Sequence, residues 1–322
     1  MAGRADRPFR SRTRALGQRM LALTLPLALL ASSQASDPLL TDLATLAAPR
    51  MEGRAPATRG SARARAHIIA RLEAIGAAPL YARYERPFRT RHRGRALRGT
   101  NVLAQIDGTD RDDHRVIVVG AHYDHVGMQG GRLHPGADDN ASGVAALLAI
   151  AQSLADKPAR HKVILAFWDA EEPGFYGARA FVADPPVPLA RIALNINLDM
   201  VSRSDKGELF AVGGKTYPQL QPVLDTLANE APIKLRFGHE GPQEGDDDWV
   251  ELSDHAAFHA KSIPFVYFGV EDHTDYHQPG DTAGKVPVEF FRGSAATILA
   301  AVRAFDAALD TAPGLAGPAP GR

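Results

Sequence analysis

Residues 115–122 have the sequence RVIVVGAH, in which valine and isoleucine follow one another without polar alternation. Two further apolar runs come later in the chain, KVILAFW at residues 162–168 and IALNINLD at residues 192–199. Helical patterns lie between them, at residues 141–154 and 177–182. Strands that are buried on both faces and alternate with helices predict an α/β fold, with a mixed, mostly parallel twisted sheet sandwiched between helices.

The first 35 residues differ in composition from the rest of the chain. Residues 1–35 carry six arginines and a single acid, Asp6, and contain the apolar run MLALTLPLALLA before the small residues Ser33 and Ala35. This pattern predicts a signal peptide that is cut after Ala35, and hence export to the periplasm or the medium. The apolar run is shorter than the roughly 20 residues that a membrane-spanning helix needs, so we expect no stable membrane insertion after cleavage.

The body of the chain is expected to form a single domain over residues 36–310. N-terminal helices and an arginine-rich lead-in take up residues 36–98, the catalytic core residues 99–310, and a disordered tail residues 311–322. The whole sequence has 37 basic and 37 acidic residues, but without the arginine-rich leader the acids exceed the bases by five, which argues against nucleic acid as a partner. The chain has no cysteine, which excludes disulfides, cysteine-type zinc sites and a cysteine nucleophile. The oligomeric state stays open.

Polar residues follow each of the three predicted strands at its carboxyl end. His122 and Asp124 follow the first strand, Glu171 and Glu172 the second, and Asp199 the third. In open α/β sheets the carboxyl ends of the strands form the ligand-binding edge, so these side chains should converge there. A cluster of acids with few cations nearby requires a compensating positive charge, and a bound metal ion would supply it.

Two more segments bring ligand types to the same edge. The loop GADDNASG occupies residues 136–143, and the predicted strand IPFVYF at residues 263–268 is followed by His273 and His277. Histidine and carboxylate without cysteine favour zinc, with cobalt and manganese as alternatives, and a carboxylate can bridge two ions about 3.5–4 Å apart. The sequence therefore predicts a two-metal hydrolytic site. His125 and His273 flank motif residues; they are candidates for lining the site but are not among the expected ligands.

Six motifs occur in a fixed order: AHYDHVG, PGADDNASG, AEEPGFYGA, NLDM, SDHAAF and DYHQPGDT. In this order and combination the chain resembles the M28 family of co-catalytic zinc aminopeptidases, over residues 100–281. The resemblance implies a zinc-exopeptidase-like (phosphorylase/hydrolase-like) fold and two zinc ions per chain. The implied metal ligands are His122, Asp139, Glu172, Asp199 and His277.

The resemblance also implies which residues would bind each ion and which would act as the general base. Asp139 would bridge both ions; His122 and Asp199 would complete one site, and Glu172 and His277 the other. Glu171 would be the general base that takes a proton from the metal-bound water and passes it to the leaving amine.

Three further residues are expected to support the reacting groups. Asp124 would hold the His122 imidazole in one tautomer, and Asp254 and His255 of the SDH motif would lie near the substrate or behind the ligands. The family can place a tyrosine shortly before SDH, but residues 249–252 contain none. The donor that stabilises the tetrahedral intermediate therefore stays open between His255, Tyr267 and the metal itself.

The resulting functional prediction is an exported zinc aminopeptidase acting on peptides with a free N-terminus. A glutaminyl cyclase with one zinc is the nearest alternative, and a non-catalytic M28-like binding domain is another. A carboxypeptidase would need a cation for the substrate carboxylate, for which Arg203 is a weak candidate, whereas an acid among residues 246–248 could hold the α-amine of an aminopeptidase substrate. The sequence has no HExxH helix, no GxSxG elbow and no glycine-rich phosphate loop, and it does not predict side-chain specificity.

Overall fold

A computed structural model describes residues 1, 3 and 37–311 of the chain. The predicted cleavage point after Ala35 lies outside the described residues, as does the predicted tail beyond residue 311. Among the described residues no helix combines the length and the apolar character needed to span a membrane.

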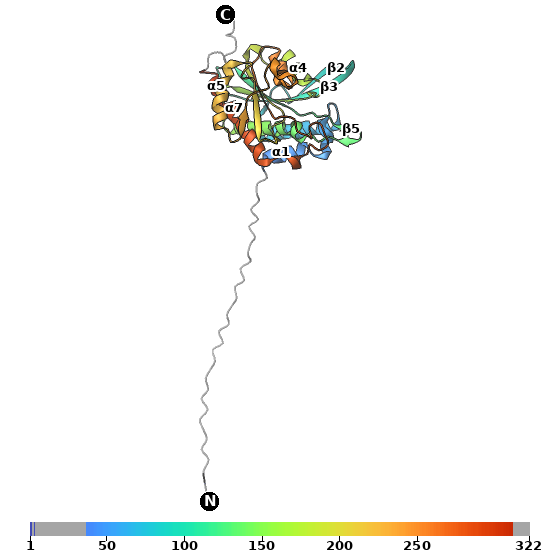
Figure 1. Ribbon diagram of the computed structural model, residues 1–322, viewed down its shortest axis with the longest axis vertical. Coiled ribbons are helices and arrows are strands. Elements are labelled where there is room, and N and C mark those ends of the chain that lie inside the picture. Colours follow the sequence, from blue (N-terminus) through green and yellow to red (C-terminus); the bar gives the residue numbers. More distant parts are fainter. Residues whose placement is uncertain (2, 4–36, 312–322) are drawn as a thin grey trace. The chain divides into compact units, whose positions relative to one another are not determined.

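Among the described residues, four parallel strands form the centre of a nine-stranded sheet, in the order β7-β4-β8-β11. Figure 1 shows the sheet between α4 above and α1 below, with β2 and β3 at one edge. They are β4 (Val116–His122), β7 (Lys162–Trp168), β8 (Ile192–Leu198) and β11 (Phe265–Gly269). Every residue of β4, β8 and β11 is buried, which explains why their sequences lack polar alternation. Because these strands are parallel, their carboxyl ends meet at one edge of the sheet.

The outer strands make the sheet mixed, as the sequence predicted. On one side β3 (Arg95–Ile106) pairs antiparallel with β7, and β1 (Ala78–Pro79) and β2 (Glu85–His92) pair antiparallel with β3. On the other side β9 (Glu208–Val212) pairs antiparallel with β11, and β10 (Lys234–Arg236) pairs parallel with β9. The short strands β5 (Met128–Gln129) and β6 (Arg132–Leu133) form a separate hairpin. The arginine-rich lead-in is thus part of the sheet, since β3 runs across residue 98.

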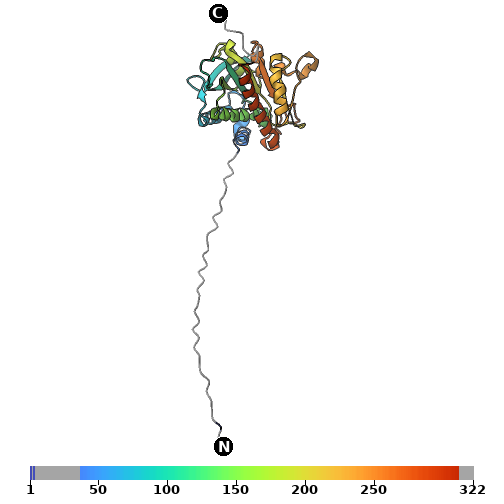
Figure 2. The same ribbon diagram turned by 90° about the vertical axis from the view of Figure 1, so that its left-hand side faces the viewer.

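Helices cover both faces of the sheet (Figure 2). One face packs against α1 (Pro38–Leu46), α2 (Arg59–Ile75), α3 (Gly143–Asp156), α5 (Gln221–Glu230) and α7 (Val288–Ala308). The other packs against α4 (Tyr176–Ala183) and α6 (His255–His259). Shorter helical turns are η1 (Pro49–Arg54), η2 (Ala137–Ser142), η3 (Leu189–Arg191), η4 (Pro218–Leu220), η5 (Pro242–Asp247), η6 (Trp249–Glu251) and η7 (Ala283–Lys285).

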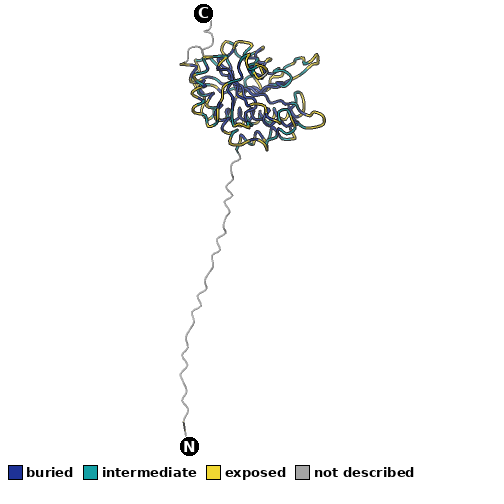
Figure 3. Tube along the Cα trace, in the orientation of Figure 1, coloured by how far each residue is buried: buried dark blue, intermediate teal, exposed yellow. Residues whose placement is uncertain are grey.

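Successive residues of β7 contribute to two different core clusters, one on each face of the sheet. In Figure 3 the buried residues, in dark blue, lie inside the trace, and most of the exposed residues, in yellow, lie at its periphery. On β7, Leu165 and Phe167 pack against the five-helix face, whereas Ala166 and Trp168 pack against α4 and α6. The Trp168 ring lies edge-on to Phe181 of α4, with 5.2 Å between the ring centroids. These contacts fix the strands in register and so fix the positions of the side chains at their carboxyl ends.

Helix α2 illustrates how local signals set the element boundaries. The sequence pattern predicts a helix over residues 62–75 that is closed by Gly76. In the structure α2 begins earlier, at Arg59, because the Thr58 hydroxyl accepts a hydrogen bond from the Ser61 amide at 3.2 Å. The helix ends where predicted, at Gly76, which adopts the left-handed conformation (φ 82°).

Candidate active site

The five predicted metal ligands converge at the carboxyl edge of the parallel strands. His122 ends β4, Asp199 directly follows β8, and Glu172 lies in the loop after β7. Asp139 comes from η2, in front of α3, and His277 from the long loop after β11. Asp139 is 3% exposed and Asp199 8%, so these carboxylates are held largely away from water.

Asp139 lies between the two predicted sites and faces each with a different oxygen. Its Oδ1 is 3.5 Å from His122 Nε2, and its Oδ2 is 3.0 Å from His277 Nε2. A carboxylate placed in this way can bridge two ions.

The first group consists of His122, Glu171 and Asp199, whose potential ligand atoms all lie within 4.8 Å of one another. His122 Nε2 is 3.0 Å from Asp199 Oδ1 and 4.0 Å from Glu171 Oε2. The predicted base therefore lies beside the predicted ligands of one ion.

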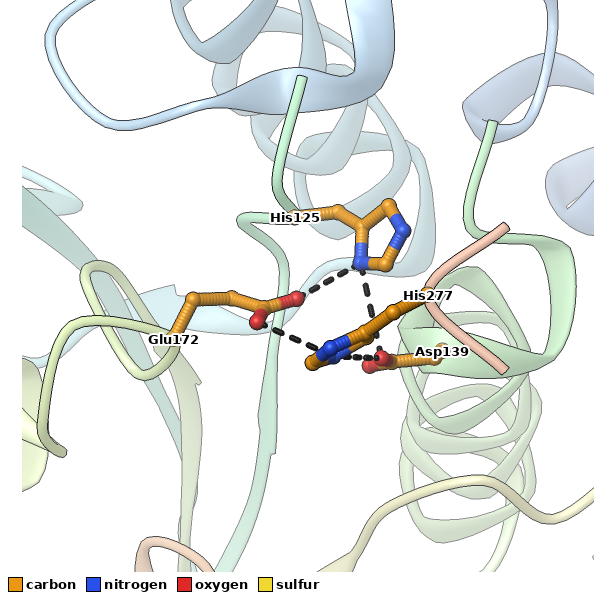
Figure 4. A group of neighbouring side chains, drawn as sticks. All are labelled: His125, Asp139, Glu172 and His277. Carbon is orange, nitrogen blue, oxygen red and sulfur yellow. Dashed lines mark hydrogen bonds and ion pairs between the residues drawn. The ribbon is translucent and has the colours of Figure 1, made fainter. Parts of the chain in front are cut away.

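The second group contains a residue that the sequence analysis left out. His277 Nε2 is 3.1 Å from Glu172 Oε2, and His125 Nδ1 is 2.6 Å from Glu172 Oε1 and 3.5 Å from Asp139 Oδ2 (Figure 4). His125 is fully buried, and its ligand atom lies within 4.8 Å of those of Asp139, Glu172 and His277. The available signal was its place in AHYDH, three residues after His122.

The donor set fits divalent zinc. Asp139 Oδ2 is buried and makes no hydrogen bond within the described residues, although two histidine nitrogens lie within 3.5 Å of it. Imidazole nitrogens and carboxylate oxygens without any sulfur are the ligands of catalytic zinc sites, and a cation at this point would satisfy the orphaned oxygen.

Comparisons with known proteins identify the family of the chain. Residues 101–302, more than half of the chain, match the sequence profile of peptidase family M28. This chain belongs to peptidase family M28. An aminopeptidase of Pseudomonas aeruginosa is 33% identical over 192 residues, which cover 58% of this chain and 34% of that protein. A probable lipoprotein aminopeptidase of Mycobacterium tuberculosis is 36% identical over 176 residues, again 34% of its length. The chain thus spans about a third of the curated relatives that it matches.

Solved structures show the same fold. A zinc aminopeptidase from Bacillus subtilis superposes with a TM-score of 0.55 at 25% identity, over 65% of this chain and 51% of that one. A glutaminyl cyclase from Porphyromonas gingivalis superposes with a TM-score of 0.69 at 19% identity, over 83% and 96% of the two chains. At 19% identity the similarity to the cyclase supports the fold alone. Together the two structures confirm the predicted zinc-exopeptidase-like architecture of this M28 chain.

Asp124 supports the M28 site in a different way from the one predicted. The His122 Nδ1 atom lies 3.2 Å from the main-chain carbonyl of Asp124, whereas the nearer carboxylate oxygen is 3.8 Å away. The carboxylate instead accepts hydrogen bonds from the amides of Glu171 at 3.0 Å and Glu172 at 3.4 Å. Because the two amides at the start of this turn need an acceptor, Asp124 fixes the paired glutamates, and its carbonyl orients the imidazole.

The SDH motif lies behind Glu171 in the M28 site. Burial raises the pKa of Asp254 to about 8, and neither carboxylate oxygen has a hydrogen-bond partner among the described residues. Burial also raises the pKa of Glu171 well above its usual value, and the carboxylates of Asp199 and Asp254 add to that shift. Ser253 Oγ donates a hydrogen bond to Asp199 Oδ2 at 2.7 Å, so Ser253 too serves this site.

His255 and Tyr267, the two side chains expected as possible donors to the tetrahedral intermediate, both contact main-chain carbonyls. Burial lowers the pKa of His255 to about 4, so the ring is neutral, and its Nε2 lies 2.8 Å from the Trp249 carbonyl. The Tyr267 hydroxyl donates to the Asp199 carbonyl at 3.4 Å. Tyr276 was not considered, yet its ring stacks on His277 with 4.0 Å between centroids, and burial together with the nearby carboxylates raises its phenol pKa.

Arg54 is a second residue that the sequence analysis missed. It is fully buried and donates hydrogen bonds to the carbonyls of Tyr123 at 2.8 Å, Pro135 at 2.7 Å and Gly136 at 2.8 Å. Burial lowers its pKa to about 10, while the carboxylates of Asp139 and Asp281 oppose that shift. Arg54 therefore joins the loop after β4 to the loop that carries Asp139 and places a positive charge near the Asp139 carboxylate.

Asp281 of the motif DYHQPGDT also holds the loop that carries Asp139. Its carboxylate accepts hydrogen bonds from the amides of Asp138 at 3.0 Å and Asp139 at 3.1 Å. The loop that carries Asp139 is therefore fixed by groups from both ends of the described chain.

Two candidate substrate-binding groups have local partners. Arg203 is 2.6 Å from Asp275, so its charge is already balanced by a carboxylate. In the acidic loop, Asp247 accepts from Trp249 Nε1 at 3.1 Å and Asp248 from the Val250 amide at 3.2 Å. These contacts do not support Arg203 as an anchor for a substrate carboxylate, and they give Asp247 and Asp248 roles within the loop.

A third cluster, made of Asp113, His161 and Asp310, also has potential ligand atoms close together. It lies near the amino-terminal starts of β4 and β7, away from the M28 site. Arg115 pairs with Asp113 and lies 2.8 Å from Asp310, so these carboxylates are already neutralised. The cluster is an ion-pair network that holds the end of α7.

Proposed function

We propose that this chain is an exported, zinc-dependent aminopeptidase that hydrolyses N-terminal peptide bonds at a site with two zinc ions. The observation that carries the proposal is the position of Asp139, whose two oxygens face two separate groups of histidine and carboxylate ligands. Its M28 membership and the similarity to a zinc aminopeptidase support the choice of metal and reaction. Cobalt and manganese accept the same ligands.

Each predicted ligand has a defined place in this proposal. His122 and Asp199 hold one ion, Glu172 and His277 hold the other, and Asp139 contacts both. Zinc bound there acts as a Lewis acid and provides a nucleophilic water at neutral pH. The protein residues must then orient the substrate and move the protons.

Glu171 is the proposed general base. Its carboxylate lies at the edge of the first group, 4.0 Å from His122 Nε2, and its backbone is held by Asp124. In this position Glu171 can accept the proton of the attacking water and pass it to the nitrogen of the leaving amine. Because Glu172 is turned toward His125 and His277, the two adjacent glutamates have different roles.

Tyr276 is the proposed donor to the oxyanion of the tetrahedral intermediate. Burial, together with the nearby carboxylates, raises the pKa of the Tyr276 phenol and keeps it protonated, and its ring is stacked on His277. A protonated hydroxyl beside a ligand of the second group can donate to an oxygen that becomes negative during the reaction.

The decisive experiment measures zinc content and peptide hydrolysis on the same purified mature protein. We expect two zinc ions per chain and release of free amino acids from aminoacyl-anilides, with activity lost on chelation and restored by zinc. One zinc with cyclisation of N-terminal glutamine would instead identify a cyclase, and release of C-terminal residues would identify a carboxypeptidase. Metal-free protein that stays inactive after zinc addition would identify a binding domain.

Export is a separate part of the proposal. The leader pattern of residues 1–35 supports it, and one relative is described as a probable lipoprotein. N-terminal sequencing of the protein recovered outside the cytoplasm should give a chain that starts at Ser36. A chain that keeps residues 1–35 and stays in the cytoplasm would refute this part alone.

A further inference from the structure

His125 occupies the same position relative to the two carboxylates of the second group as His277 does. Each histidine presents one ring nitrogen to both Glu172 and Asp139, and the four side chains alternate around a common centre (Figure 4). We propose that His125 is a fourth protein ligand of the ion at Asp139, Glu172 and His277. This site is then closed, whereas the site at His122 and Asp199 is open.

The distances between the donor atoms fit a single small ion. Four ligands bound to zinc at 2.0–2.1 Å in a tetrahedron lie about 3.3 Å from one another. The four measured separations are 2.6 Å from His125 to Glu172, 3.5 Å from His125 to Asp139, 3.1 Å from His277 to Glu172 and 3.0 Å from His277 to Asp139. Three of these separations lie within about 0.3 Å of the tetrahedral value, and the fourth, from His125 Nδ1 to Glu172 Oε1, must lengthen by about 0.7 Å for the group to surround zinc. His125 and His277 face different oxygens of Glu172, Oε1 and Oε2.

The fold fixes the His125 ring in this orientation. His125 is fully buried, and its Nε2 has no hydrogen-bond partner among the described residues, so the carboxylates at Nδ1 are its polar contacts. The ring packs against Gly136, where a Cβ atom would come within 2.5 Å of His125 Cδ2. Gly136 also has a positive φ of 57°, so this position favours glycine for two independent reasons.

A simpler role for His125 would be to donate a hydrogen bond to Glu172 and so orient that ligand. The geometry favours ligation, because Nδ1 points between two carboxylates rather than along one of them. A residue that only oriented Glu172 would have no reason to face Asp139 as well.

The proposal makes the two sites unequal. The second site has four protein ligands, as structural zinc sites do, while the first has His122, Asp199 and the shared Asp139, as catalytic sites with an open position do. We therefore expect the second site to fill first and to retain its ion longest, and the open position of the first site to be where exchange and substrate contact occur.

Zinc titration of the metal-free full-length mature protein tests this directly, with calorimetry as the readout. The wild type should bind two ions in two phases of different affinity. His125→Ala should weaken the tighter phase more than about 100-fold, beyond the 10- to 100-fold typical for loss of an outer partner, and leave the weaker phase unchanged. Equal affinity of the tighter phase in His125→Ala and wild type would overturn the proposal.

Two variants separate ligation from hydrogen bonding. In His125→Asn the amide can still donate to Glu172 but is a poor zinc ligand, so the tighter phase should remain lost. Its recovery in His125→Asn would show that donation suffices and would refute ligation. His134→Asn is the matched control, since His134 is also buried, lies in the neighbouring loop and contacts the Arg132 carbonyl at 3.2 Å.

X-ray absorption of the wild type at one equivalent of zinc needs no variant. We expect two imidazole nitrogens around the ion, from His125 and His277; a single imidazole would contradict the proposal. The inference rests on the proposed function only in requiring zinc at this edge, and neither readout uses catalysis. Zinc binding that depends on His125 without peptide hydrolysis would refute the proposed function alone, and hydrolysis with unchanged binding in His125→Ala would refute this inference alone.

Discussion

Ser253 holds Asp199 by a hydrogen bond of 2.7 Å to Oδ2, which leaves Oδ1 facing His122 Nε2 at 3.0 Å. The Ser253 hydroxyl in turn accepts a hydrogen bond from Asn197 at 2.9 Å, so its own orientation is fixed by β8. Asp199 Oδ2 is therefore held by a hydrogen bond from the protein, and Oδ1 is left to bind a metal ion beside His122.

Removing this support should weaken one metal site and spare the other. We expect Ser253→Ala to lower zinc affinity at the His122 site by about 10- to 100-fold, because Asp199 loses the partner that orients it. Calorimetric titration measures both phases. Ser294→Ala is the control, since Ser294 is equally buried but its hydroxyl donates to the Phe290 carbonyl within α7; an equal loss in both variants would contradict the prediction.

Replacement of the proposed base should separate chemistry from metal binding. Glu171→Gln keeps the size of the side chain but cannot accept the proton, so kcat should fall by about 10²- to 10⁴-fold. Zinc content should stay at the wild-type value, because Glu171 is not one of the proposed ligands. A variant that loses zinc together with activity would instead make Glu171 a ligand.

The Tyr276 hydroxyl should matter for the transition state more than for binding. We expect Tyr276→Phe to lower kcat by about 100-fold, as for loss of one oxyanion donor, with KM little changed because the ring still stacks on His277. Tyr267→Phe serves as the comparison, since that hydroxyl faces a main-chain carbonyl. A larger loss of kcat in Tyr267→Phe would reverse the assignment.

Arg54 should be required for stability even though it binds no metal in our proposal. Arg54→Met leaves the carbonyls of Tyr123, Pro135 and Gly136 buried without their donor, and Asp139 without a nearby cation. We expect a loss of about 3–5 kcal/mol in the free energy of unfolding, measured in urea. Arg54→Lys should recover only part of it, because an ammonium group cannot reproduce the planar fork of donors. Full recovery with lysine would mean that charge alone matters.

The network that holds the end of α7 predicts a dependence of stability on pH. Hydrogen bonds from Arg115 hold the pKa of Asp113 well below its usual value. A carboxyl whose pKa is lower in the folded than in the unfolded protein stabilises the fold above its unfolded pKa of about 3.9, and this contribution is lost as the pH falls. Asp113→Asn should therefore be less stable than the wild type at pH 7, and the difference should narrow below about pH 4.

Urea denaturation at several pH values measures this difference. The neighbouring Asp112→Asn is the control, since Asp112 makes no ion pair among the described residues. A gap between Asp113→Asn and the wild type that stays constant down to pH 3 would contradict the prediction.

One sequence feature, the long apolar runs, predicts both the parallel strands at the centre of the sheet and the edge at which the candidate ligands lie. Strands buried on both faces leave long apolar runs, so the first polar residue after each run marks the carboxyl edge, as His122 and Asp199 do. The outer strands give no such signal. The β2–β3 hairpin is rich in exposed arginine, and β10 has only three residues, so neither segment has a pattern that distinguishes a strand from a loop.

His125 and Arg54 were missed because their roles depend on contacts distant in sequence. The His125 ring reaches Glu172, 47 residues away, only because the loop after β4 folds back against Gly136. Arg54 lies in the segment MEGRAPATRG, which is typical of a turn-rich link between helices. Apart from the nearby Leu46 carbonyl, its hydrogen-bond partners are 69 to 85 residues further along. For Arg54 the local pattern gives no sign of these contacts, and for His125 the available signal is its place in AHYDH.

The positions of Arg54 and Asp281 along the chain determine when the site can form. The loop that carries Asp139 is held by a guanidinium from the beginning of the described chain and by a carboxylate from near its end. During synthesis, residues 138 and 139 leave the ribosome long before residue 281, so the loop that carries Asp139 lacks its Asp281 contacts until β11 and the loop after it have been made. A nascent chain of this protein therefore lacks the complete site, which forms only together with the finished tertiary structure.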